Sequence, residues 1–243
     1  KYGYDLQVPQ TYQQFYDIAE FFTRKKGEDL CGQPLEDDFW GTVHSLKPGG
    51  YFLHDYLPYA IAWGIPKTYY HDPETMQPMW NSKQHKDAAR FLMSLKPFMP
   101  EGVGTMTSGA STSLFADGRA AMIVEWVGRT VLICNDEKAS KIIGKWDYTV
   151  APSLPETGVK GGGMFNQHTL LVYSLSQNQE AAYKLIENVF SKESMKDLFI
   201  KQNMVVPRKS ALESPEAKQI SWAKNLGGAM DPARTTFSYH PPM

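Results

Sequence analysis

The stretch FADGRAAMIVEWVG, from Phe115 to Gly128, decides how the chain is read. A turn at Asp117-Gly118 leads into an apolar run from Ala120 to Val124, which is typical of a buried β-strand. The run ends on Glu125 and Trp126, a charge and a large ring that a buried strand does not favour. Ligands of α/β sheets bind where strands end. We therefore expect Glu125 and Trp126 to surface at a binding site.

The flanking sequence predicts further helices and strands in alternation, which favours an α/β architecture. Thr11 and Gln14 fit a capping box, followed by an apolar stripe at helical spacing and by Arg24, Lys25 and Lys26 at the expected helix end. Other helices are expected from about Phe52 to Trp63 with an interruption near Pro58, from Asn81 or Ser82 to Pro97, up to the turn at Asp117, around 182–189, and from Ser191 to about Lys201. Strands are expected at Trp146–Ala151 and Thr169–Tyr173.

The composition excludes several classes of protein. The chain has 243 residues, which is long enough to bury a hydrophobic core. Its formal net charge is −1, so no overall positive field would attract nucleic acid. No run of 18 apolar residues occurs, so no transmembrane helix is expected. Cys31 and Cys134 are compatible with one disulfide or with two free thiols. The chain starts at Lys1 without a methionine and ends on FSYHPPM, so we expect it to be part of a longer protein.

Signatures of catalysis are missing from the sequence. The motifs of serine hydrolases, zinc proteases, P-loop enzymes and dithiol oxidoreductases do not occur, and GVKGGG precedes a strand rather than the helix of a dinucleotide site. The six histidines have no ligand spacing, so neither a metal nor a cofactor is expected. One enzymatic alternative stays open: a hydrolase that pairs Glu125 with a loop carboxylate such as Asp37 or Asp38.

Six tryptophans, mostly near loops or element ends, favour a different role. The ordinary explanation is that most of them pack in the core. The alternative is a stacking platform, since the apolar C–H face of a sugar lies well on an aromatic ring while its hydroxyls need carboxylates or amides. Glu125 beside Trp126 supplies both groups at one strand end.

The order of several short motifs resembles the family 1 extracellular solute-binding proteins of ABC importers, the group that contains maltose-binding protein. The shared features are Pro9, Thr11 and Tyr12 at a helix start, Phe115 and Gly118–Met122 before a strand, VAPSLP after another strand, a Gly-Gly turn before LLVY, SQNQEAA at a helix start, and VPRKSAL at Val206–Leu212. No single motif is decisive, but six of them follow in order over most of the chain.

The resemblance implies a periplasmic-binding-protein-like type II α/β fold, with two lobes around a ligand cleft. Residues 1–151 would form the second lobe, 152–209 a segment of the first lobe, and 210–243 a truncated return to the second lobe. Carried over by position, the ligand-binding candidates are Glu125, Trp126, Gly162, Gly163, His168 and Trp63. The tripeptide Gly-Pro-Trp that often follows this strand in the family is replaced by Glu-Trp-Val-Gly.

The resemblance also implies a function. It predicts a non-enzymatic, monomeric substrate-binding component that captures a small solute, a carbohydrate by expectation, and delivers it to the membrane-spanning permease subunits of an ABC importer. The expected location is periplasmic or extracellular, with a lipid anchor in the full-length protein as an option. Besides the hydrolase, a second alternative is a binding protein for a non-sugar such as a polyamine, a peptide or a metal chelate.

Overall fold

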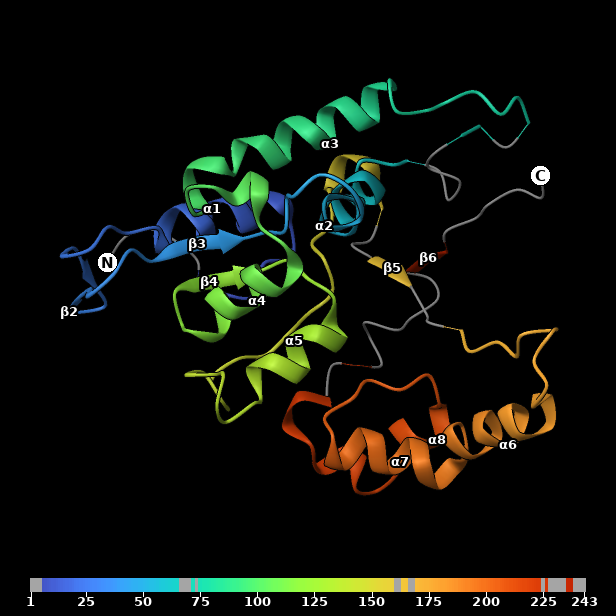
Figure 1. Cartoon of the computed structure of the whole chain (residues 1–243). Helices are drawn as coiled ribbons and strands as arrows, with labels where there is room; N and C mark the ends of the chain where they lie inside the picture. Colours follow the sequence, from blue (N-terminus) through green and yellow to red (C-terminus); the bar gives the residue numbers. More distant parts are fainter. Residues whose placement is uncertain are drawn as a thin grey trace.

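The computed structural model describes residues 6–65, 71–72, 74–159, 163–165, 169–223, 226 and 235–237. Within these residues the strands form three two-stranded sheets. The helices are α1 (Tyr12–Phe22), α2 (Gly50–Ala62), α3 (Lys83–Ser94), α4 (Ser108–Ala116), α5 (Val127–Cys134), α6 (Gln179–Val189), α7 (Lys192–Lys201) and α8 (Lys209–Leu212). The strands are β1 (Asp29–Leu30), β2 (Gln33–Pro34), β3 (Trp40–Val43), β4 (Ala120–Ile123), β5 (Gly163–Phe165) and β6 (Thr235–Phe237). Helices pack around the pair of β3 and β4, whereas β2 lies at the edge of the molecule (Figure 1). The expected α/β class is confirmed.

The sheet that positions the site is the parallel pair of β3 and β4. Their register aligns Trp40 with Ala120 and Val43 with Ile123. Parallel strands need a long crossover, and here α2, α3 and α4 lie within it. Helix α4 runs back along β4, so that the helix begins near the carboxyl end of the strand (Figure 1). Both strands therefore point their carboxyl ends toward the start of α4.

Three clusters of buried apolar side chains hold the described residues together. The largest joins α1, α2 and α3 around Tyr12, Leu57 and Leu92. A smaller cluster packs α4 against the sheet, with Phe115 near Trp40. The remaining cluster brings α7, α8 and the segment around Trp222 together with Val131 of α5. Burial of these faces is the main stabilising contribution, because amphipathic helices gain more from packing than from intrinsic propensity.

Most expected helices are confirmed, with two corrections at their bounds. The capping box at Thr11 is present, Ser82 caps α3 and Ser191 caps α7. Helix α2 continues through Pro58 without the expected interruption. Helix α1 ends at Phe22, before the basic residues that were expected at its end. The chain leaves the helix there because the backbone of Arg24 forms a bridge with Phe39.

Two expected strands are wrong as assigned. Neither 146–151 nor 169–173 forms a strand in the structure, although both sequences have strand composition. A strand is stable only as part of a ladder, and within the described residues neither segment lies in one.

The expected burial of β4 is also only partly correct. Ala120 is buried, whereas the other three residues of the strand are half-buried.

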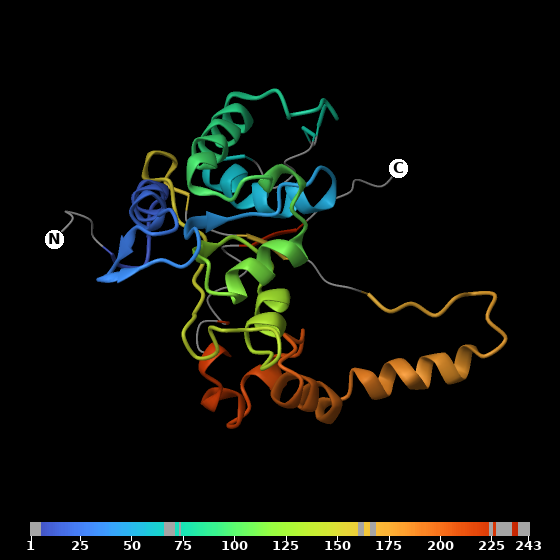
Figure 2. The same ribbon diagram turned by 60° about the vertical axis from the view of Figure 1, so that its left-hand side comes forward.

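The segment that leads into α6 differs from the rest of the molecule. Figure 2 shows α6 standing away from the body, and no residue of this helix is buried. The large apolar side chains that this region exposes are Leu170, Leu171, Tyr173, Leu175, Tyr183 and Leu185. Several exposed large apolar side chains within one stretch of sequence are typical of a segment that another part of a protein covers. Elsewhere, the structure resolves the alternative for the cysteines: Cys31 is an exposed free thiol and Cys134 a buried one.

Candidate solute-binding site

The site is built at the carboxyl ends of β3 and β4. Beyond Val43 the chain continues into His44 and Ser45, and beyond Ile123 it continues into Val124 and Glu125. Two helices begin beside these strand ends, α4 at Ser108 and α5 directly after Trp126. Open α/β sheets bind ligands at this edge. The position that the sequence predicted for Glu125, at the end of β4, is the one that it occupies.

The carboxylate of Glu125 lies within hydrogen-bonding distance of four donor groups. Its Oε1 atom accepts a hydrogen bond from the backbone N–H of Trp126 at 2.7 Å. Its Oε2 atom accepts from the hydroxyls of Ser45 at 3.2 Å, of Ser111 at 3.4 Å, and of Ser108. Ser108 and Ser111 belong to the first turn of α4, where the helix dipole favours a negative charge. These contacts fix the carboxylate group in one orientation.

A second carboxyl group, that of Asp55 on α2, lies behind Glu125. The side chain of Asp55 is 1% exposed, and it accepts a hydrogen bond from the backbone N–H of Ser45. Burial, together with the negative charge of Glu125, raises the pKa of Asp55 well above its ordinary value, and the hydrogen bond from Ser45 only partly opposes this shift. Burial of Asp55 therefore favours the neutral form of its carboxyl group.

A further pair of buried polar groups, His44 and Tyr59, lies in the core of the same elements. The Tyr59 hydroxyl lies 2.6 Å from Nε2 of His44, which is fully buried. Burial lowers the pKa of His44 to about 3, so the imidazole is neutral. Its Nδ1 atom has no hydrogen-bond partner within the described residues. The interior of the site is thus built from neutral polar groups, and the charge is concentrated at Glu125.

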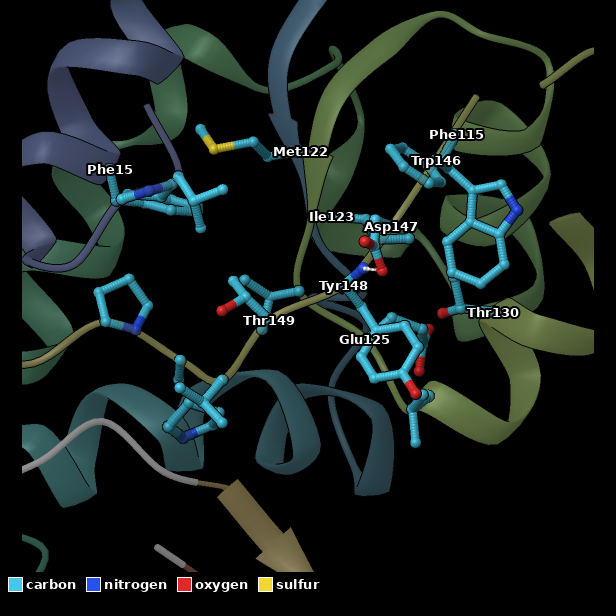
Figure 3. Close-up of a pocket in the computed structure, with 18 of the residues that line it drawn as sticks. Phe15, Phe115, Met122, Ile123, Glu125, Thr130, Trp146, Asp147, Tyr148 and Thr149 are labelled. Atoms are coloured by element: carbon cyan, nitrogen blue, oxygen red, sulfur yellow. Dashed lines mark hydrogen bonds between the residues drawn. The ribbon is translucent and has the colours of Figure 1, made fainter. Parts of the chain in front are cut away.

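A cavity of about 630 Å³ opens beside Glu125, between β4 and the segment 146–152 (Figure 3). Phe15 and Met122 lie toward one end, whereas Glu125, Thr130, Trp146 and Tyr148 are gathered toward the other (Figure 3). The full lining comprises Val8, Pro9, Tyr12, Phe15, His54, Pro58, Phe115, Ala121–Val127, Thr130 and Trp146–Pro152. Its volume is within the range of small-molecule sites.

The structure brings two of the six candidate residues together. Glu125 and Trp126 both line the cavity, and the ring of Trp126 is 41% exposed. Trp63 does not line it; its ring packs 5.2 Å from Tyr12 and 5.1 Å from Phe91, at the edge of the main core. Gly163 belongs to β5, whose backbone pairs with β6.

The remaining candidates, Gly162 and His168, lie outside the described residues.

Sequence reasoning missed several residues that shape the cavity. Trp146 and Tyr148 both line it, with ring centroids 6.2 Å apart. The spacing of Trp146 and Tyr148 could have indicated this, since residues two apart in an extended segment face the same side. Ser108 and Ser111 carried no comparable signal. Their role depends on where α4 begins relative to Glu125, which only the tertiary structure shows.

Residues 4–232 match the family described as bacterial extracellular solute-binding protein. The chain belongs to this family. The expected resemblance to extracellular solute-binding proteins is confirmed, and the family's members are carriers rather than enzymes. No described helix of this solute-binding protein is long and apolar enough to cross a membrane. None of the curated proteins matches the sequence.

Solved structures of solute-binding proteins share the fold. An ABC transporter solute-binding protein from Agrobacterium radiobacter K84, in complex with ribitol, matches with a TM-score of 0.77 and 21% identity over 92% of this chain and 53% of its own. Maltose-bound MalE3 from T. maritima matches with a TM-score of 0.74 and 20% identity over 100% of this chain and 57% of its own. A protein from Agrobacterium vitis S4 with bound D-mannitol has a TM-score of 0.66 and 19% identity, over 88% of this chain and 49% of its own.

These matches confirm the expected type II periplasmic-binding-protein fold. This solute-binding chain spans about half the length of the structures that it matches.

Proposed function

We propose that this chain is part of the substrate-binding component of an ABC importer that captures a sugar or polyol and delivers it to the transmembrane permease subunits. The observation that carries the proposal is the pairing of Glu125 and Trp126 on the wall of one cavity at a strand end. Similar folds hold ribitol, maltose and D-mannitol in the solved structures. We further propose a monomer that works in the periplasm or outside the cell, with a lipid anchor in the full-length protein.

The wall offers the two interactions that a polyhydroxylated solute needs. The exposed ring of Trp126 provides an apolar face for C–H groups. Within the described residues, Oε1 of Glu125 accepts a hydrogen bond only from Trp126 N–H, and a carboxylate oxygen has room for a second donor. A solute hydroxyl is the matching donor. Affinity would therefore combine stacking with a charge-assisted hydrogen bond.

The proposed lobes are residues 1–151 for the second lobe, 152–209 for a segment of the first, and 210–243 for the return. The exposed apolar side chains between Leu170 and Leu185 support assigning this part of the chain to the first lobe, because the remainder of that lobe would cover them, whereas α7 packs with Val131 of α5. Ligand binding would then favour the closed arrangement of the two lobes. Gly162, Gly163 and His168 stay predictions for the part of the site that the first lobe supplies.

The first test is a ligand screen. Thermal shifts measured with ribitol, D-mannitol, maltose and spermidine should show a rise in melting temperature for at least one sugar or polyol, because a ligand stabilises the state that it binds. Incubation with oligosaccharides should release no new reducing ends. If spermidine alone stabilises the protein, or if reducing ends appear and are lost in Glu125→Gln, the proposed function is wrong.

A variant pair tests the role of the ring. Trp126→Ala should weaken binding of the stabilising solute by about 1–2 kcal/mol, roughly a five- to thirtyfold rise in Kd by calorimetry. Trp80→Ala is the matched control, because Trp80 is equally exposed at 41% and does not line the cavity. Equal losses of affinity in the two variants, or a loss of folding in Trp126→Ala alone, would assign the ring of Trp126 to structure instead.

A further inference from the structure

The first turn of α4 is the kind of place where proteins bind anions, and here the protein fills it with its own carboxylate. Free backbone N–H groups and the helix dipole make a helix N-terminus attractive to phosphate or carboxylate groups. The hydroxyl of Ser108, which would otherwise be a donor for such a group, donates to Glu125 Oε2, and the hydroxyl of Ser111 lies 3.4 Å from the same oxygen and 3.0 Å from the carbonyl oxygen of Ser108. Thr107 already accepts a hydrogen bond from the backbone N–H of Ala110. The carboxylate of Glu125 therefore occupies the place beside this turn where an anion would bind.

The charges around the cavity have one sign. Among the described lining residues, the charged side chains are Glu125 and Asp147, and no lysine or arginine lines the cavity. Asp147 is exposed, and its Oδ1 atom accepts a hydrogen bond from the N–H of Tyr148 at 2.8 Å. Arg129 follows Trp126 by three positions on α5 but is not part of the lining. Among the described lining residues, the charged groups are therefore acidic, and one of them, Glu125, is adjacent to Trp126.

Building on the proposed function, we propose that this wall selects against negatively charged solutes, so that sugar acids and sugar phosphates are excluded from the polyhydroxylated compounds that the protein binds. A carboxylate placed at hydrogen-bonding distance from Glu125 meets a like charge whose orientation is held by the Trp126 N–H and the Ser108 hydroxyl. The repulsion corresponds to a roughly 10- to 1,000-fold loss of affinity, depending on how much water remains. A hydroxyl at the same place donates a hydrogen bond, and an ammonium group gains from the same field.

The test is a series of matched ligands that differ in the functional group, and therefore in the charge, at one carbon. If D-mannitol is the solute that binds best in the screen, the series is D-mannitol, D-mannonate and 1-amino-1-deoxy-D-mannitol; for ribitol, the corresponding ribonate and amine are used. Calorimetry on the wild-type protein should give a Kd for the acid at least about tenfold above that of the polyol, and a Kd for the amine no higher than that of the polyol. Added salt should bring the Kd values of the acid and of the amine closer to the Kd of the polyol.

Glu125→Gln sharpens the test, since glutamine keeps an acceptor oxygen and removes the charge. The ratio of the acid and polyol Kd values should fall by about tenfold or more in this variant. Glu137→Gln is the control, because it makes the same chemical change at an exposed position outside the cavity. Binding of the acid as tightly as the polyol by the wild-type protein overturns the inference and leaves the proposed function standing. Failure of every sugar and polyol to bind overturns the proposed function itself.

Discussion

The hydroxyl of Ser108, the first residue of α4, donates a hydrogen bond to the carboxylate of Glu125, which lies two residues beyond β4. The two groups meet because the chain turns back at Gly118 between the helix and the strand. Gly118 has φ of +72°, a conformation that favours glycine. Because of this turn, the N-terminus of α4 faces the carboxyl end of β4. It also explains how a charged side chain can follow an apolar strand without an energetic penalty for an unpaired charge.

Ser108→Ala is expected to destabilise the protein by about 1–2 kcal/mol, because it removes a donor to an ionised carboxylate. Urea unfolding followed by circular dichroism measures the change. Ser113→Ala is the control on the same helix, since Ser113 is exposed and alanine favours a helix. If both variants lose the same stability, the Ser108 hydroxyl contributes nothing specific to Glu125.

His44 should make the folded state sensitive to acid. Its pKa is about 3 in the folded protein and 6.5 for the ordinary side chain. Between these values the unfolded chain binds one more proton than the folded chain, so stability falls as the pH decreases. The contribution of His44 to this slope reaches about 1.4 kcal/mol per pH unit.

His44→Gln should therefore flatten the dependence of the unfolding free energy on pH between about 4.5 and 6.5, as followed by urea titrations at several pH values. His71→Gln, at an exposed histidine, is the matched control. A slope for His44→Gln that equals the wild-type slope would mean that His44 already takes up a proton in the folded protein.

Local chemistry explains what the sequence could predict. The capping residues Thr11, Ser82 and Ser191 were identified correctly, because their hydrogen bonds involve residues only a few positions away. The position of Glu125 at a strand end followed from the apolar run before it. The sequence was insufficient where the outcome depends on distant partners.

The segment 169–173 has the composition of a strand, but no described strand pairs with it. The same dependence on distant partners limited the prediction of the site. Trp63 and Trp126 look alike in the sequence, each at the end of an apolar stretch. Trp63 becomes part of an aromatic cluster because Tyr12 and Phe91 come from two other helices to meet it. The buried role of Asp55 depends in the same way on Ser45 and Glu125, which are distant in the chain. No spacing rule brings such groups together.

Asp55→Asn should stabilise the protein increasingly as the pH rises. The pKa of Asp55 lies above its ordinary 3.8 in the folded state, so the folded chain holds an extra proton above pH 3.8 and loses stability as the pH rises toward the folded pKa. Asparagine is neutral at every pH and keeps an acceptor oxygen for Ser45 N–H. The unfolding free energies of variant and wild type, compared by urea titration at pH 5 and at pH 8, should diverge. Parallel pH curves would show that Asp55 is ionised in the folded protein.

Gly41→Ala is expected to lower the stability of the protein strongly, although it adds only one methyl group to the sheet of β3 and β4. Gly41 lies in β3 under α1, and a Cβ atom there would stand 1.8 Å from the backbone oxygen of Ala19. The backbone of the helix cannot yield as a flexible side chain would. The helix is also tied down nearby, because the Thr23 hydroxyl accepts a hydrogen bond from Gly41 N–H at 3.0 Å. The strand and the helix must therefore separate to admit the methyl group.

We expect a loss of about 3 kcal/mol or more for Gly41→Ala, measured as a lower urea midpoint and a lower melting temperature. Gly104→Ala is the matched control, because a Cβ at Gly104 meets no atom within 4 Å and its backbone needs no left-handed conformation. That variant should stay within about 1 kcal/mol of the wild type. Since β3 carries Ser45 toward Glu125, Gly41→Ala should also disturb the site, and a variant that folds should bind the polyol more weakly. Full stability in Gly41→Ala would mean that α1 does not pack on β3 as closely as the structure shows.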